Sequence, residues 1–146
     1  MTVIAWDGTT LAADRCVITD GHRRSVTKIR QHHGCLAAGS GHLTSILQMH
    51  AWFMHGEDLA HYPACQTAPG DEWCEYVIVR PDRTVWRFES PPVAIPVVEE
   101  TFACGAGRDY AYGAMAYGAN AYRAVEIASQ YNNACGGGVD FLKLPE

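Results

Sequence analysis

The chain has 146 residues, of which 48% are hydrophobic and 18% are charged; this composition excludes an intrinsically disordered protein and is consistent with one domain over residues 1–146. A formal net charge of −5 without a basic stripe argues against nucleic acid as a partner. The N-terminus has no cationic segment followed by an apolar run, and no apolar run reaches the length of a membrane helix, so we expect a cytoplasmic protein without a membrane partner.

The first third of the chain is predicted to form β-hairpins. Residues 2–6 and 9–13 are rich in β-forming side chains and flank Asp7-Gly8, a strong hairpin turn signal. The nearly continuous apolar run at 11–13 indicates a strand that is covered on both faces. Further short strands are expected at residues 16–18, 25–30 and 35–38, separated by an exposed loop at 20–24 and a turn at 31–34.

One helix and a second group of strands are predicted for the middle of the chain. Gly39-Ser40-Gly41 is typical of a strand-to-helix turn that Ser40 caps, and apolar residues at helical spacing predict the helix itself over 42–55. Residues 56–70 are expected to be irregular. Strands are then expected at 75–80 and 84–89, joined by a turn at 81–83 and followed by an extended segment at 91–96.

The last third is predicted to begin with a strand and to end with one. The first strand runs into a glycine-containing turn over residues 101–107, and two helices follow at 110–117 and 122–131. The final segment, 135–142, is a glycine-rich turn leading into a strand.

Thr2, Asp14 and Lys28 could supply the parts of a threonine nucleophile. If Met1 is removed, Thr2 carries a hydroxyl and an α-amine on one residue, so nucleophile and base arrive together. The α-amine has an ordinary pKa of about 7.7–8.0, which a nearby ammonium lowers, and a carboxylate keeps that ammonium oriented. Asp14 is expected to end a buried strand, where a carboxylate needs a partner. Each residue alone has an ordinary structural explanation; together, in this order, they favour a catalytic site.

This pattern resembles the start of the β-type proteasome subunits and of their bacterial relative HslV, including short HslV-like proteins of phages and bacteria. The shared features are the threonine, a short hairpin that ends in Ala12-Ala13-Asp14, and Lys28-Ile29 about fifteen positions later. The resemblance implies an α/β (α+β) N-terminal nucleophile (Ntn) hydrolase, a four-layer αββα sandwich with two mainly antiparallel sheets. It also implies that Thr2 is the nucleophile and that Asp14 and Lys28 support it.

The resemblance further implies an oxyanion hole and exposes three departures. In the family a glycine after the next strand gives its backbone N–H to the oxyanion; Gly39 and Gly41 both fit, and we assign Gly39. Where the family has two serines and an aspartate near the threonine, this chain has Ala106, Cys135 and Asn132. Alanine has no hydroxyl to contribute, and the other two keep hydrogen-bonding ability without the charge of an aspartate.

No cofactor is expected to be required for hydrolysis. A structural monovalent or divalent cation near the C-terminal glycine turn is compatible with the resemblance to HslV, and its ligands are not assigned. The six cysteines form neither Cys-x-x-Cys nor zinc-finger spacings and are interpreted as free thiols. The seven histidines are interpreted as surface or helix-end residues and not as a metal site.

The resemblance implies a threonine-type endopeptidase subunit of a self-compartmentalising protease. Its partners would be copies of itself in homo-oligomeric rings, an HslU-like AAA+ ATPase and an unfolded polypeptide substrate. Two alternatives remain on the same fold. The departures at Ala106, Asn132 and Cys135 would suit a non-catalytic ring or shell protein, and the same nucleophile would also suit a small-molecule amidase.

Overall fold

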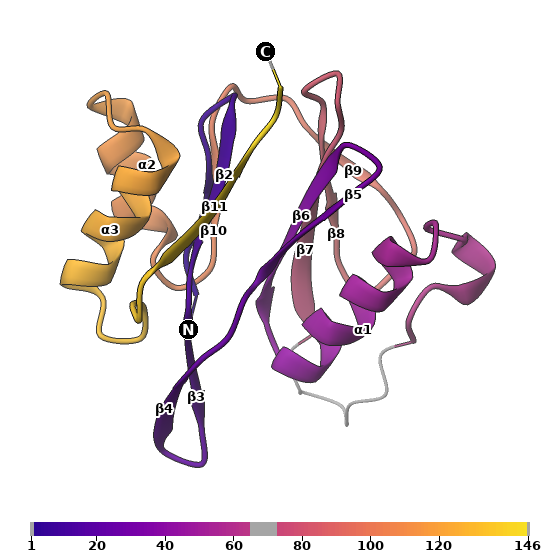
Figure 1. Ribbon diagram of the computed structural model, residues 1–146, viewed down its shortest axis with the longest axis horizontal. Helices are drawn as coiled ribbons and strands as arrows, with labels where there is room; N and C mark the ends of the chain where they lie inside the picture. Colours follow the sequence, from indigo (N-terminus) through magenta and orange to yellow (C-terminus); the bar gives the residue numbers. More distant parts are fainter. Residues whose placement is uncertain (1, 65–72, 146) are drawn as a thin grey trace.

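Two antiparallel β-sheets face each other, and helices cover their outer faces (Figure 1). The computed structural model describes residues 2–64 and 73–145. The first sheet has the strand order β10-β1-β2-β11, with β10 (Phe102–Cys104), β1 (Ile4–Trp6), β2 (Thr10–Asp14) and β11 (Val139–Lys143). The second has the order β5-β6-β7-β8-β9, with β5 (Ile29–His32), β6 (Cys35–Gly41), β7 (Cys74–Val79), β8 (Val85–Phe88) and β9 (Ile95–Val97).

In the part of the chain that the structure describes, three helices complete a four-layer αββα sandwich. The first sheet is covered by α2 (Arg108–Ala116) and α3 (Ala121–Tyr131), and the second sheet is covered by α1 (Leu43–Met54) (Figure 1). A short 3-10 helix, Leu59–His61, follows α1. None of these helices is both long and apolar enough to cross a membrane. The predicted four-layer αββα sandwich with two antiparallel sheets is therefore confirmed.

The inner strands have apolar side chains on both faces, as the sequence predicted. In β1, Ile4 and Trp6 point into the core between the sheets, whereas Ala5 packs under α2 and α3. In β2, Leu11 likewise lies between the sheets and Ala12 lies under the helices. Because successive side chains of a strand alternate between its faces, a strand covered on both sides is apolar at most positions, and its buried polar residues need partners.

Several predicted boundaries are wrong in the first half of the chain. Residues 22–24, expected in an exposed loop, and Ser25, expected to begin the next strand, form β4 (His22–Ser25). This strand pairs with β3 (Cys16–Thr19) in a hairpin beside the two sheets (Figure 1). All four β4 side chains are exposed, so no apolar alternation marked the strand. The strand expected at 25–30 begins only at Ile29, so residues 26–28 do not belong to a strand.

The expected turn Gly39-Ser40-Gly41 is instead the end of β6. Gly39 lies opposite Tyr76 and Gly41 opposite Cys74, so pairing with β7 holds an otherwise weak strand sequence extended. Ser40 does not cap α1; the N-cap residue is His42, which forms no side-chain cap hydrogen bond. Part of the segment expected to be irregular, 65–70, lies outside the described residues. So does Cys65, whereas the other five cysteines are free thiols.

His50 is buried inside α1, which contradicts its interpretation as a surface residue. Its Nδ1 lies 2.6 Å from the Tyr76 hydroxyl oxygen. Burial first, and the charge of Arg30 second, lower the pKa of His50 from 6.5 to about 3. Between these values the unfolded chain binds a proton that the folded protein does not, so stability is complete above about pH 6.5 and falls on acidification.

We expect the free energy of unfolding to fall by up to about 1.4 kcal/mol per pH unit below 6.5 through this group. Urea denaturation at pH 7.5, 6.5 and 5.5 would measure the slope. His50→Gln should flatten it, whereas His55→Gln, at the exposed end of α1, should leave it unchanged. An unchanged slope in His50→Gln would contradict this origin of the pH dependence.

Candidate active site

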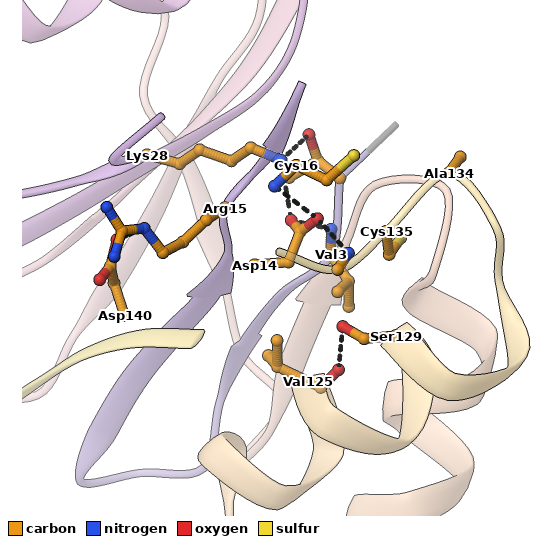
Figure 2. Close-up of polar contacts among 12 residues, drawn as sticks. Val3, Asp14, Arg15, Cys16, Lys28, Val125, Ser129, Ala134, Cys135 and Asp140 are labelled. Atoms are coloured by element: carbon orange, nitrogen blue, oxygen red, sulfur yellow. Dashed lines mark hydrogen bonds and ion pairs between the residues drawn. The ribbon is translucent and has the colours of Figure 1, made fainter. Parts of the chain in front are cut away.

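The Asp14 carboxylate is the centre of a buried polar network at the end of β2 (Figure 2). Its Oδ1 accepts hydrogen bonds from the backbone N–H of Val3 at 3.1 Å and from Lys28 Nζ at 2.8 Å. Its Oδ2 accepts from the backbone N–H groups of Gly136 at 2.9 Å and Cys16 at 3.3 Å. Both carboxylate oxygens are thus satisfied, which a fully buried carboxylate requires.

Lys28 joins this carboxylate to the threonine hydroxyl. Its Nζ lies 3.1 Å from Thr2 Oγ1 and 2.8 Å from Asp14 Oδ1, and all three side chains are buried. The Thr2 carbonyl oxygen accepts a hydrogen bond from the Gly107 backbone N–H at 3.1 Å. The three residues that the sequence singled out therefore meet in one site, with the lysine between the other two.

The two facing sheets bring these distant residues together. Val3 directly precedes β1, and its carbonyl oxygen accepts the Asp14 backbone N–H at 3.1 Å. Lys28 directly precedes β5 in the second sheet and reaches across to the first sheet. Its carbonyl oxygen accepts the backbone N–H of Gly39 at 3.3 Å, which fixes the lysine's main chain.

Gly39 and Gly41 occupy different surroundings. A Cβ on Gly39 would come within 2.8 Å of the Ile46 side chain and 3.0 Å of the Tyr76 ring, so this glycine allows α1 and β7 to pack closely. Its N–H already has the Lys28 carbonyl as a partner. Gly41 has φ +116 and lines a cavity next to the site. The assignment of the oxyanion N–H to Gly39 stays a prediction, and this geometry favours Gly41.

The three departures from the family pattern lie around the same site. The Asn132 amide donates to the Ala106 carbonyl oxygen at 3.0 Å and accepts from the Ala134 backbone N–H at 2.9 Å, so it ties two loops together. Cys135 is fully buried, and burial followed by the charge of Asp14 raises the pKa of its thiol to about 11. A thiol that stays neutral at physiological pH is a poor nucleophile.

Arg23 is a residue of this region that sequence reasoning missed. Its Nη2 donates to the Cys135 carbonyl oxygen at 2.6 Å, and its Nε lies 3.2 Å from Cys16 Sγ. Gly136 has φ +134, and a Cβ there would come within 2.7 Å of Arg23 Nη2. The arginine thus anchors the β3–β4 hairpin to the glycine loop before β11. An exposed basic run in the sequence gave no signal of this long-range contact.

Within residues 2–64 and 73–145, no group of three or more histidine, cysteine, aspartate or glutamate side chains is placed to hold a metal ion. A cation held by backbone oxygens near the glycine turn at 136–138 stays a prediction.

The two antiparallel sheets between helix layers are the arrangement that the resemblance to Ntn hydrolases predicted. No protein-family model and no curated protein matches the sequence. Solved structures do match it over the whole chain. One is BPH from Thiobacillus denitrificans in complex with epoxomicin, with 21% identity, a TM-score of 0.72 and 100% of both chains covered.

Two further solved structures agree with this match. BPH from the same organism, in a second structure, has 21% identity and a TM-score of 0.71, with 99% of this chain and 98% of that chain covered. Eukaryotic HslV from Trypanosoma brucei has 16% identity and a TM-score of 0.68, with 100% of both chains covered. The chain therefore has the HslV-like, proteasome β-type fold that its first thirty residues predicted.

Proposed function

We propose that this chain is a threonine-type endopeptidase subunit that uses Thr2 as its nucleophile once Met1 is removed. The observation that supports this most directly is the position of Lys28 Nζ, within hydrogen-bonding distance of both Thr2 Oγ1 and Asp14 Oδ1 in a buried site. The HslV-like fold over the full chain is a second, independent support. An N-terminal threonine supplies nucleophile and base together, so no cofactor is required.

The reaction would proceed through an ester on Thr2. Thr2 Oγ1 attacks the carbonyl carbon of a peptide bond, and its proton passes to the α-amine of the same residue. The Lys28 ammonium, held by Asp14, donates to this oxygen and stabilises the negative charge that develops on it. The α-amine then gives the proton to the leaving amine, and water hydrolyses the ester.

The Gly41 N–H is our revised candidate for the oxyanion hole. Alternate N–H groups of an antiparallel strand point to the same edge of that strand. The N–H groups of Gly39 and Gly41 therefore both point to the edge of β6 that faces β5. At this edge the Gly39 N–H donates to the Lys28 carbonyl oxygen, and β5 begins only at Ile29, so it does not pair with Gly41. An N–H at this position would face substrate instead of a neighbouring strand.

The assembly that we propose is a homo-oligomeric ring enclosing the active sites, in the cytoplasm, with an HslU-like AAA+ ATPase that feeds unfolded polypeptide into it. The support is the full-length similarity to HslV. A threonine site open to bulk solvent would cleave any unfolded chain that reached it, and enclosure prevents this.

The proposal is tested by the intact mass of the purified protein before and after treatment with epoxomicin, the compound bound in the BPH structure. We expect loss of Met1 and one adduct per chain. Thr2→Ala should give no adduct, and Thr44→Ala, on the exposed face of α1, should label like the unmodified chain. A retained Met1, or a free Thr2 that never labels, would support a non-catalytic ring or shell protein. Labelling by a monomer or dimer in size-exclusion chromatography would instead support the amidase.

A further inference from the structure

A cavity of about 690 Å³ lies beside the candidate active site, between the ends of the two sheets. One side of it is formed by Ser40 and Gly41 at the end of β6 and by Gly105 and Ala106 in the turn after β10. A volume of this size is typical of a site that binds a small molecule or a side chain.

The cavity is continuous with the residues that hold Thr2. A Cβ on Gly105 would lie 2.2 Å from the Thr2 carbonyl oxygen and 3.0 Å from Ser40 Oγ, so only a glycine fits between them. Ala106, the next residue, accepts the Asn132 amide through its carbonyl oxygen. A peptide attached to Thr2 would therefore have this cavity next to the reacting bond.

The other side of the cavity has a surplus of carboxylates. Glu75, in β7, and Glu89, directly after β8, both line it. They share one cation: Arg87 Nη2 lies 3.6 Å from Glu75 Oε2 and 2.6 Å from Glu89 Oε1. At the mouth, the largely exposed Arg108 lies 3.8 Å from the carboxylate of Asp109. Of the charged residues that line the cavity itself, Glu75 and Glu89 are acidic and Arg108 is basic, so the lining carries one net negative charge.

Both glutamates are placed to act on a ligand in this cavity. Glu75 is partly buried, and its charge reaches the fully buried Cys104 thiol in the same wall: burial first, then Glu75, raises the pKa of this thiol. A partly buried carboxylate is screened less by solvent than a surface one. Trp73 and Pro91, also in the wall, offer apolar surface to the methylene groups of a long side chain.

We propose that this cavity, hereafter the Glu75–Glu89 cavity, binds a lysine or arginine side chain of the substrate at one of the two positions flanking the cleaved bond. Glu75 and Glu89 share the single guanidinium of Arg87, and the ammonium or guanidinium of the substrate supplies a second cation to this pair. This inference rests on the peptidase function proposed above and adds to it a preference for basic residues.

The test is a panel of peptides that differ only at the two positions flanking one cleavable bond, where Lys, Arg, Gln, Glu or Leu is placed. Cleavage is followed by mass spectrometry, and the ratio of kcat/KM for Lys over Gln is the readout. We expect a ratio of roughly ten at one of the positions. In Glu75→Gln and Glu89→Gln the ratio should fall towards one.

Glu99→Gln is the matched control, because Glu99 is exposed and does not line this cavity. It should keep the ratio of the unmodified chain. Cleavage without a basic preference, or a preference that survives in both cavity variants, would overturn this inference and leave the peptidase function standing. No cleavage of any peptide together with no epoxomicin adduct would overturn both.

Discussion

Lys28→Met should give a folded protein whose peptide hydrolysis is slower by roughly 10²–10⁴-fold, the usual contribution of a group that handles charge and protons at the reacting atom. Methionine has nearly the length of lysine and can occupy the same buried channel, but it donates nothing to Thr2 Oγ1. The fold should survive because Asp14 keeps three backbone N–H donors, from Val3, Cys16 and Gly136.

The chain contains one other lysine, which makes a matched control possible. Lys143 is exposed on β11, and Lys143→Met should retain full activity. Both variants would be compared by kcat/KM on one fluorogenic peptide and by urea denaturation. If Lys28→Met hydrolysed the peptide as fast as Lys143→Met, Lys28 would have no part in the chemistry.

Asp14→Asn should have the largest effect on stability, about 3–5 kcal/mol in the free energy of unfolding. Every group that contacts the Asp14 carboxylate is a donor, so an asparagine must direct its own NH2 group at another donor in either orientation of the amide. With the NH2 group in the place of Oδ1, it meets Lys28 and Val3; in the place of Oδ2, it meets Gly136 and Cys16. The buried lysine also loses its counter-ion.

A double-mutant cycle would separate these contributions. Adding Lys28→Met to Asp14→Asn removes the uncompensated lysine, so the double variant should be more stable than Asp14→Asn alone. Asp109→Asn, an exposed residue of α2, serves as the control and should change the urea midpoint little. An Asp14→Asn protein that unfolded at the same urea concentration as the Asp109→Asn protein would show that the network does not stabilise the fold.

Local sequence information indicated a strand covered on both faces and a buried carboxylate that needs a partner, whereas the four layers and the site roles came from the family resemblance. The apolar run around Leu11 indicated a strand covered on both sides, and that strand lies between the α2–α3 layer and the facing sheet. Asp14 at the end of such a strand required a partner, and Lys28 provides it. Both inferences depended on burial, which composition and spacing reveal.

The remaining features depend on contacts between segments far apart in the chain. Strand β4 is exposed along its whole length, so no pattern distinguished it from a loop. Gly39 was considered for its N–H alone, and only the pairing of β6 with Lys28 and β7 showed that this group has a partner. The bonds of Arg23 and Asn132 to backbone carbonyls leave no trace in composition or periodicity.

The hydrogen bond between Gly136 and Asp14 also has a consequence for the order of events during synthesis. Its two residues are 122 positions apart, and β11 pairs with β2 across a similar separation. Contacts of such high sequence separation form late, after the intervening chain has been made. The Asp14 carboxylate thus lacks one of its backbone donors until Gly136 and β11 have been synthesised. The Asp14–Lys28 pair is therefore completed only by a segment that is synthesised more than a hundred residues after it.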